Sequence, residues 1–132
     1  MSPRPLYIPS VILCVDDEST GLKARCLLLS IAGYKVLSAT NVADAQTIVQ
    51  RNRVDLVITG NFSSDPTGAQ VAFQMKRLKP AVPIVLLTGS LESSRKAEGA
   101  DLFLTNGMDP AGFLAEIRKL LSKSQPSRAD AA

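Results

Sequence analysis

The sequence predicts a three-layer α/β domain built around a parallel β-sheet. Five short apolar runs recur along the 132 residues, and stretches with helical periodicity separate them. Strands buried on both faces of a parallel sheet have nearly continuous apolar runs of this kind. Strict alternation of strands and helices favours right-handed crossovers, with helices on both faces of the sheet. The expected strands cover residues 11–15, 34–38, 54–59, 83–87 and 102–104.

The first half of the chain predicts two helices with clear boundaries. The first covers residues 19–32, and Gly33 follows it, where a residue with positive φ often ends a helix. Asn41 is the expected N-cap of the second helix. Apolar residues recur on one face of each helix, as in amphipathic helices that pack on a core. They are Leu22, Cys26 and Leu29 in the first helix, and Val42, Ala45, Ile48 and Val49 in the second.

The second half predicts three further helices of unequal strength. Residues 68–78 form the third, with Val71, Met75 and Leu78 facing inward. Residues 91–99 form a weak fourth helix, because Leu91 and Ala97 are its only apolar side chains between polar neighbours. Asp109 and Pro110 supply an N-cap and an N1 proline for the last helix. Its apolar face is Phe113, Leu114, Ile117, Leu120 and Leu121.

Composition places the chain among ordinary globular proteins with one domain. Hydrophobic residues make up 45% and charged residues 20%, with a net charge of +3. The domain is expected over residues 10–123, after an irregular lead-in at 1–9 and before a disordered tail at 124–132. The densest basic group, Lys76, Arg77 and Lys79, suits a helix end, so we expect no nucleic-acid binding. The first apolar run is too short for a signal peptide or membrane span, which predicts a cytoplasmic protein without a membrane partner.

Cysteine and histidine usage excludes several kinds of site. The chain has no histidine, so a histidine-based triad or metal site is excluded. Cys14 and Cys26 are too few and too far apart in sequence for a zinc knuckle or a CxxC redox pair. Both fall on apolar faces, which predicts buried thiols in a reducing compartment.

Short motifs follow the expected strands in a fixed order. They are Asp16-Asp17, then Asp55-Leu56-Val57-Ile58-Thr59, then Gly68, then Thr88-Gly89, and last Gly99-Ala100-Asp101 before Phe103-Leu104-Thr105. With this order and spacing, the chain resembles the receiver domain of two-component response regulators over residues 11–121. The resemblance implies a flavodoxin-like (βα)5 fold, with a five-stranded parallel sheet in the order 2-1-3-4-5.

The resemblance also implies roles for particular residues. Asp16 and Asp17 match the acidic pair that helps to bind magnesium. Thr88 matches the hydroxyl residue after the fourth strand, and Phe103 matches the switch aromatic. The phosphoacceptor aspartate and the lysine of the family are replaced here by Gly60 and Asn106.

These two replacements remove the phosphorylation chemistry that the family would imply. Receiver chemistry needs a carboxylate to attack the phosphoryl group, a divalent cation on its oxygens and a lysine on the developing charge. Gly60 has no nucleophile, and Asn106 carries no positive charge. We therefore expect no catalytic residue, no enzyme activity and no cofactor beyond weak Mg²⁺ at Asp16 and Asp17.

Each remaining motif also has a purely structural interpretation. Asp16 and Asp17 could simply solvate a strand end and cap the first helix. Thr88 could satisfy backbone groups of a loop, and Phe103 could be a core residue. Asp65, in a polar loop, decorates the surface unless that loop folds back over the pocket, in which case it could be a substitute acceptor.

The sequence thus predicts a stand-alone pseudo-receiver that signals by protein–protein contact. Expected partners are a histidine kinase, a regulator or an output protein, with a homodimer as a further arrangement. The expected contact face combines residues 91–99, the fifth strand and the exposed side of 109–123. The alternative is a receiver that still accepts phosphate through Asp65. A nucleotide-binding protein of similar fold is disfavoured, because neither GxGxxG nor GxxxxGK[ST] is present.

Overall fold

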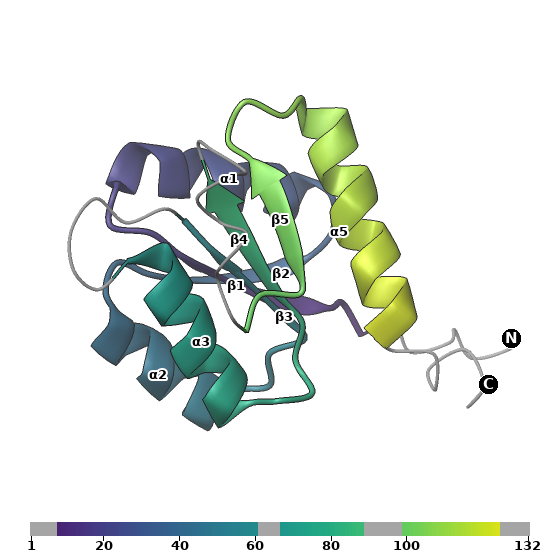
Figure 1. Cartoon of the computed structure of the whole chain (residues 1–132). Coiled ribbons are helices and arrows are strands. Elements are labelled where there is room, and N and C mark those ends of the chain that lie inside the picture. Colours follow the sequence, from purple (N-terminus) through teal and green to yellow (C-terminus); the bar gives the residue numbers. More distant parts are fainter. Residues whose placement is uncertain (1–7, 61–66, 89–98, 125–132) are drawn as a thin grey trace, which may run out of the picture.

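A computed structural model describes residues 8–60, 67–88 and 99–124 of the chain. Several expectations fall outside these ranges: the lead-in up to residue 7, the loop at 61–66 with Asp65, nearly all of the helix at 91–99, and the tail at 125–132. The described residues form one sheet flanked by helices (Figure 1).

The sheet has five parallel strands in the order β2-β1-β3-β4-β5, which confirms the predicted strand order. Because all strands run in the same direction, their carboxyl ends meet at one edge of the sheet. Val15 of β1 pairs with Thr59 of β3, and Thr88 of β4 pairs with Thr105 of β5, all at this edge. The strands are β1 (Val11–Val15), β2 (Lys35–Ala39), β3 (Leu56–Thr59), β4 (Ile84–Thr88) and β5 (Leu102–Thr105).

The strand boundaries differ from the predicted ones by one or two residues, for identifiable reasons. Tyr34 is not in β2, because its N–H donates to the Leu29 carbonyl at the end of the first helix. β3 begins at Leu56, and Asp55 before it is bonded to β1 twice: its N–H donates to the Val11 carbonyl and its carboxylate accepts the Val11 N–H, each at 2.8 Å. β4 begins after Pro83, which has no N–H to donate to a ladder.

Helices cover both faces of the sheet, so the three-layer prediction is confirmed. Figure 1 shows α1 (Ser19–Ile31) and α5 (Pro110–Ser124) on one face and α2 (Val42–Arg51) and α3 (Gly68–Leu78) on the other. Gly33 has φ +104°, as expected after α1, and Asn41 accepts the Asp44 N–H as the N-cap of α2. α5 extends to Ser124, the first residue of the predicted tail.

Alternate residues of the central strands build two separate cores. In β1, Ile12 and Cys14 face the core under α1 and α5, while Leu13 and Val15 face the core under α2 and α3. All four side chains are fully buried. This two-sided burial fixes the register of β1, because a slip of one residue would exchange the two faces.

At the edge of the sheet where the strands begin, acidic side chains accept hydrogen bonds from the first N–H groups of two strands. Asp55 receives the first N–H of β1, and Asp101 receives the first N–H of β4, Ile84, at 2.7 Å. Lys76 of α3 also contacts Asp101 at 2.7 Å and thereby ties the helix to this edge. Within the described ranges, no helix combines the length and hydropathy of a membrane span.

Candidate functional site

The candidate site lies at the carboxyl-end edge of the sheet, where β1 and β3 end side by side. Asp16 directly follows β1, and Gly60 directly follows β3. The Gly60 N–H donates to the Val15 carbonyl at 2.7 Å, which continues the pairing of the two strands by one residue. Both residues are buried, and Asp16 is only 6% exposed. The structure therefore brings the predicted positions 16 and 60 together.

The Asp16 side chain occupies the space above Gly60. A Cβ atom added to Gly60 would lie 2.1 Å from Oδ2 and 2.5 Å from Cγ of Asp16. Atoms of a folded protein do not approach this closely, so any side chain at position 60 requires Asp16 to move. Among the described residues, positive φ occurs only at Gly33 and Gly99, so the constraint at Gly60 is one of space and not of backbone angle.

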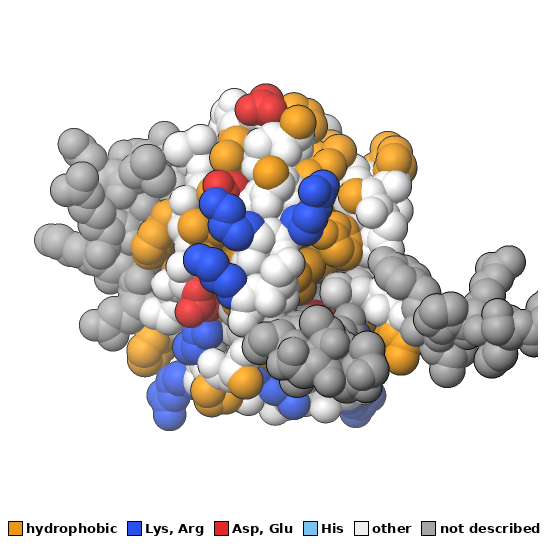
Figure 2. Space-filling view, turned by 90° about the vertical axis from the view of Figure 1, so that its right-hand side faces the viewer, with side chains coloured by type: hydrophobic (Ala, Val, Ile, Leu, Met, Phe, Trp, Pro, Cys, Tyr) orange, Lys and Arg blue, Asp and Glu red, His pale blue; other side chains and the backbone are white. Residues whose placement is uncertain are grey.

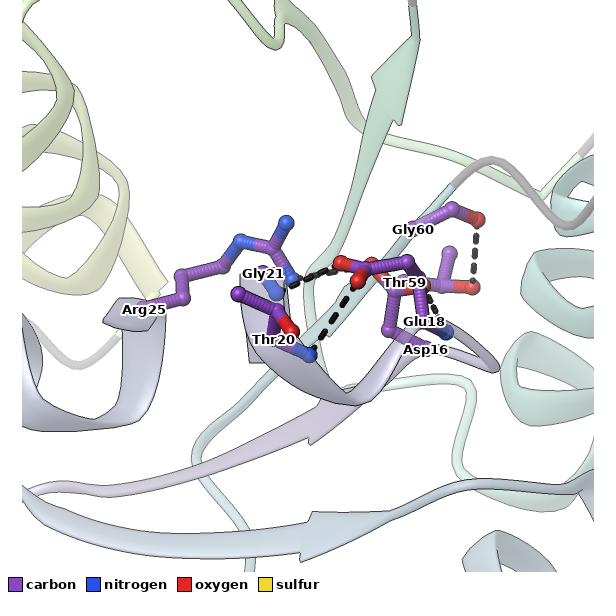
Figure 3. Close-up of polar contacts among 7 residues, drawn as sticks. All are labelled: Asp16, Glu18, Thr20, Gly21, Arg25, Thr59 and Gly60. Carbon is purple, nitrogen blue, oxygen red and sulfur yellow. Dashed lines mark hydrogen bonds and ion pairs between the residues drawn. The ribbon is translucent and has the colours of Figure 1, made fainter. Parts of the chain in front are cut away.

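An ion pair holds the Asp16 carboxylate in this position. Nη1 of Arg25, on α1, donates to Oδ2 at 3.1 Å, and the Glu18 N–H donates to Oδ1 at 2.9 Å (Figure 3). The side chains of Arg25 and Asp16 are 14% and 9% exposed. Both carboxylate oxygens thus have a donor, as a buried charge requires.

The N-cap of α1 is Glu18, a residue that the sequence interpretation had not assigned to this role. Its carboxylate accepts the N–H groups of Thr20 and Gly21, the first of them at 3.2 Å. Asp16 bonds to the capping residue and not to the helix itself, since its carboxylate accepts the Glu18 N–H (Figure 3). The expectation that Asp16 and Asp17 cap the helix is therefore wrong. Asp17 lies exposed on the surface beside them.

The other predicted site residues gather at the ends of β4 and β5. Thr88 is 2% exposed, and its carbonyl accepts the N–H of the exposed Asn106 at 3.1 Å. Phe103 is half-buried within β5, opposite Leu86. A cavity of about 400 Å³ lies between α1 and the start of α5, and both Arg25 and Asn106 line it.

Arg25 is the functional residue that sequence reasoning missed. It supplies a cation to this edge of the sheet from α1, whereas the end of β5 supplies only the neutral Asn106. A signal was present in the sequence. Arg25 lies three residues after Leu22 and one before Cys26, at the border of the apolar face of the helix, so its side chain could reach the nearby strand edge.

The metal-binding capacity of this edge is small. The described part of the chain has no cluster of three or more His, Cys, Asp or Glu side chains that could hold an ion. Of the predicted pair, Asp16 is bound to Arg25 and Asp17 faces outward. Mg²⁺ needs oxygen ligands in octahedral geometry and competes poorly with a guanidinium that is already in place. Asp16 and Asp17 could contribute to a Mg²⁺ site only after this ion pair opens.

Gly68, one of the motif residues, packs directly on the site. A Cβ atom added there would lie 2.3 Å from the Gly60 carbonyl oxygen and 2.9 Å from Cδ1 of Leu86. The first residue of α3 therefore touches the backbone at the end of β3, and only glycine allows this approach. Thr67 and Gln70 close the capping box that starts the helix here.

Comparisons with known proteins identify the family. The family model of the response regulator receiver domain matches residues 12–118. The chain belongs to this family. It is 31% identical over 123 residues to the transcriptional regulatory protein GlrR of Escherichia coli, and 28% identical over 130 residues to the phosphate regulon regulatory protein PhoB of Pseudomonas aeruginosa. These matches cover 90% and 94% of this chain but only 28% and 57% of those two relatives.

Solved receiver structures share the fold over nearly their whole length. A response regulator receiver domain from Clostridium thermocellum superposes with a TM-score of 0.79 at 27% identity, over 88% of this chain and 97% of that one. TrrA of Thermotoga maritima, crystallised with Mg²⁺ and BeF, superposes with a TM-score of 0.76 at 26% identity, over 84% and 98%. The predicted receiver fold is confirmed.

Removing the cation of the site should destabilise this receiver domain. We expect Arg25→Gln to lower the free energy of unfolding by about 2–4 kcal/mol, because Asp16 would remain buried without its partner. Arg53→Gln is the matched control, since Arg53 pairs with Asp55 but its side chain is 43% exposed. Its cost should stay within about 1 kcal/mol. Urea unfolding of both variants measures the difference, and equal costs would contradict a buried pair at Asp16.

Adding one methyl group at position 60 should displace Asp16. We expect Gly60→Ala to cost about 1–3 kcal/mol of stability, and to cost less in an Asp16→Ala background, where the obstructing carboxylate is gone. Gly107→Ala is the control, because nothing lies within 4 Å of the added Cβ. Denaturant unfolding of the four members of the cycle gives the coupling. Additive effects would mean that the two side chains do not share this space.

Proposed function

We propose that this receiver domain is a cytoplasmic pseudo-receiver, which signals through contact with protein partners and does not accept a phosphoryl group. One observation carries the proposal: the Asp16 carboxylate fills the volume over Gly60 and is neutralised there by Arg25. The position that carries the phosphoacceptor in the family has no nucleophile, and the nearest carboxylate is already in an ion pair.

Phosphoryl transfer in a receiver needs a nucleophile, a divalent cation and a cationic side chain, and the described site supports none of the three. A nucleophilic carboxylate must reach the phosphorus in line with the leaving group, and Gly60 offers none. A divalent cation must neutralise the phosphoryl oxygens, and Asp16 is engaged by Arg25 instead. Asn106 stands at the end of β5, where a cationic side chain would stabilise the developing charge.

The face formed by β5 and α5 is the surface we propose for partners. Figure 2 looks onto the side of the molecule that carries α5 and shows basic and apolar side chains interspersed there. Exposed basic residues of α5 include Arg118, Lys119 and Lys123, and the half-buried Leu114 and Leu120 lie between them and the core. Such a mixed surface suits reversible contact with a histidine kinase, regulator or output protein, or with a second copy of the chain.

Small phosphodonors should leave the protein unmodified. We expect intact-mass measurement after incubation with acetyl phosphate and Mg²⁺ to show no added phosphoryl group, because Gly60, the residue that follows β3, has no side chain. A receiver that carries aspartate at this position is the positive control. A stoichiometric, base-labile adduct would overturn the proposal. Peptide mapping of that adduct would then test Asp65 as the substitute acceptor.

Magnesium should bind only weakly, and the ion pair should be the reason. We expect calorimetric titration to give no saturable sub-millimolar binding by the native domain. Arg25→Gln frees the Asp16 carboxylate, so this variant should bind Mg²⁺ more tightly than the native domain. Asp16→Asn is the control and should abolish any residual signal. Sub-millimolar binding by the native domain would contradict the arrangement described here.

A further inference from the structure

The cavity between α1 and the first turn of α5 has the size of a small-molecule site. Its volume is about 400 Å³, and pockets that bind small molecules typically measure about 300–1,000 Å³. It lies on the face of the sheet that α1 and α5 share, and residues from β4 and from the end of β5 complete its lining (Figure 1). The cavity can therefore accept a small organic molecule.

The inner part of the cavity is apolar. Leu87 and Phe113 line it from the core under α1 and α5, and the half-buried Leu28 and Met108 pack against that core. Both helices begin at the carboxyl-end edge of the sheet, so Leu28 and Phe113 lie further from this edge than the first residues of each helix. An apolar body placed against Leu28 and Met108 would remove their exposed surface from water.

The part of the cavity nearest the carboxyl-end edge carries free donors of Arg25. A guanidinium has five N–H groups. Only Nη1 has an acceptor within the described ranges, the Asp16 carboxylate at 3.1 Å, so Nε and Nη2 are available to a ligand. Gly21 also lines the cavity, and a Cβ atom added to it would lie 3.7 Å from Nη2. The glycine thus leaves space beside this nitrogen.

The end of β5 adds further polar groups to the same edge. Thr105 and Asn106 line the cavity, and neither side chain forms a hydrogen bond in the part of the chain that the structure describes. The backbone of Asn106 is held by its bond to the Thr88 carbonyl. Its side-chain amide is therefore positioned at this edge and can donate to a ligand.

The charges around the cavity favour an uncharged ligand. Arg25 is the only charged residue among the described residues of the lining, and Asp16 already balances its charge. Asp17 and Glu18 add negative charge at the same edge. A ligand carboxylate would place a second negative charge beside Asp16, and a ligand cation would meet Arg25. A carbonyl oxygen accepts from the guanidinium and from the Asn106 amide without adding charge.

We propose that this cavity binds a small uncharged molecule with an apolar body and a carbonyl group, such as an amide or an ester. The carbonyl oxygen accepts from Arg25 and Asn106, and the apolar body lies against Leu28 and Met108. The same guanidinium then serves both the ligand and Asp16, so binding acts on the ion pair beside Gly60. The inference goes beyond the proposed function, because occupation of the cavity does not depend on whether the domain accepts phosphate.

The test is a titration of the full chain with three probes of similar shape: the uncharged phenylacetamide, the anion phenylacetate and the cation phenethylammonium. We expect phenylacetamide to shift the backbone amide resonances of Gly21, Leu28 and Met108 saturably. Its dissociation constant should be on the order of 1–10 mM for a probe of this size. Resonances of α2 and α3, on the other face of the sheet, should not move. Each charged probe should bind at least about tenfold more weakly.

Substitutions in the lining locate the probe. Ala24→Phe places an aromatic ring in the cavity and should abolish binding of phenylacetamide. Ala43→Phe, the same change at an exposed alanine of α2, is the control and should leave binding unchanged. Asn106→Leu keeps the volume of the side chain but removes a donor, so it should weaken binding about two- to tenfold. Urea unfolding before each titration establishes that the variants are folded.

Four results would overturn the proposal. The first is the absence of saturable shifts at the lining residues, even at phenylacetamide concentrations well above the expected range. The second is phenylacetate binding as tightly as phenylacetamide. The third is unchanged binding by folded Ala24→Phe, which would place the probe elsewhere. The fourth is a set of shifts centred on Leu27, which is 62% exposed on α1 and outside the lining, because it would indicate contact with the outer surface of the helix only.

Discussion

The pairing of the buried Asp16 carboxylate with Arg25 is the interaction on which this edge of the molecule depends. A buried carboxylate without donors would be costly, so each oxygen of Asp16 must be satisfied once β1 delivers it to the end of the sheet. Arg25 and the Glu18 N–H provide these donors. Together they fix the start of α1 relative to β1, because the arginine belongs to the helix and the aspartate follows the strand.

The missing side chain at position 60 makes this pairing possible. The space that a β-carbon would occupy at Gly60 is filled by the neighbouring carboxylate. The surrounding backbone contacts involve no side chain at this position: the Gly60 N–H donates to the Val15 carbonyl, and Gly68 lies against the Gly60 carbonyl. These backbone contacts require glycine at position 68 for steric reasons that are independent of phosphate chemistry. The receiver fold of this chain therefore does not depend on a side chain at position 60.

Sequence reasoning correctly predicted features that depend on the local pattern of a single helix or strand, or on the resemblance to receivers. Strand order, helix positions, the Asn41 cap and the glycine after α1 follow from local pattern and from the resemblance to receivers. It failed where two elements had to be placed against each other. The contact of Arg25 with Asp16 depends on the rotation of α1 over β1, which a periodicity of apolar residues fixes only to within part of a turn. The choice of Glu18 over Asp17 as N-cap depends on where the helix begins, and such boundaries are the least predictable feature of a sequence.

The acidic residues Asp55 and Asp101 hold neighbouring strands together at the edge of the sheet that lies opposite the candidate site. Each carboxylate accepts the N–H of the residue that begins the neighbouring strand, and each backbone N–H donates to the carbonyl of that same residue. The pairing of β1 with β3 and of β4 with β5 is thus anchored far from the candidate site. The opposite edge is held by backbone bonds, such as those from the Gly60 N–H to the Val15 carbonyl and from the Asn106 N–H to the Thr88 carbonyl. Side chains at this edge can therefore change, at a cost in stability, while the backbone bonds that set the strand register remain.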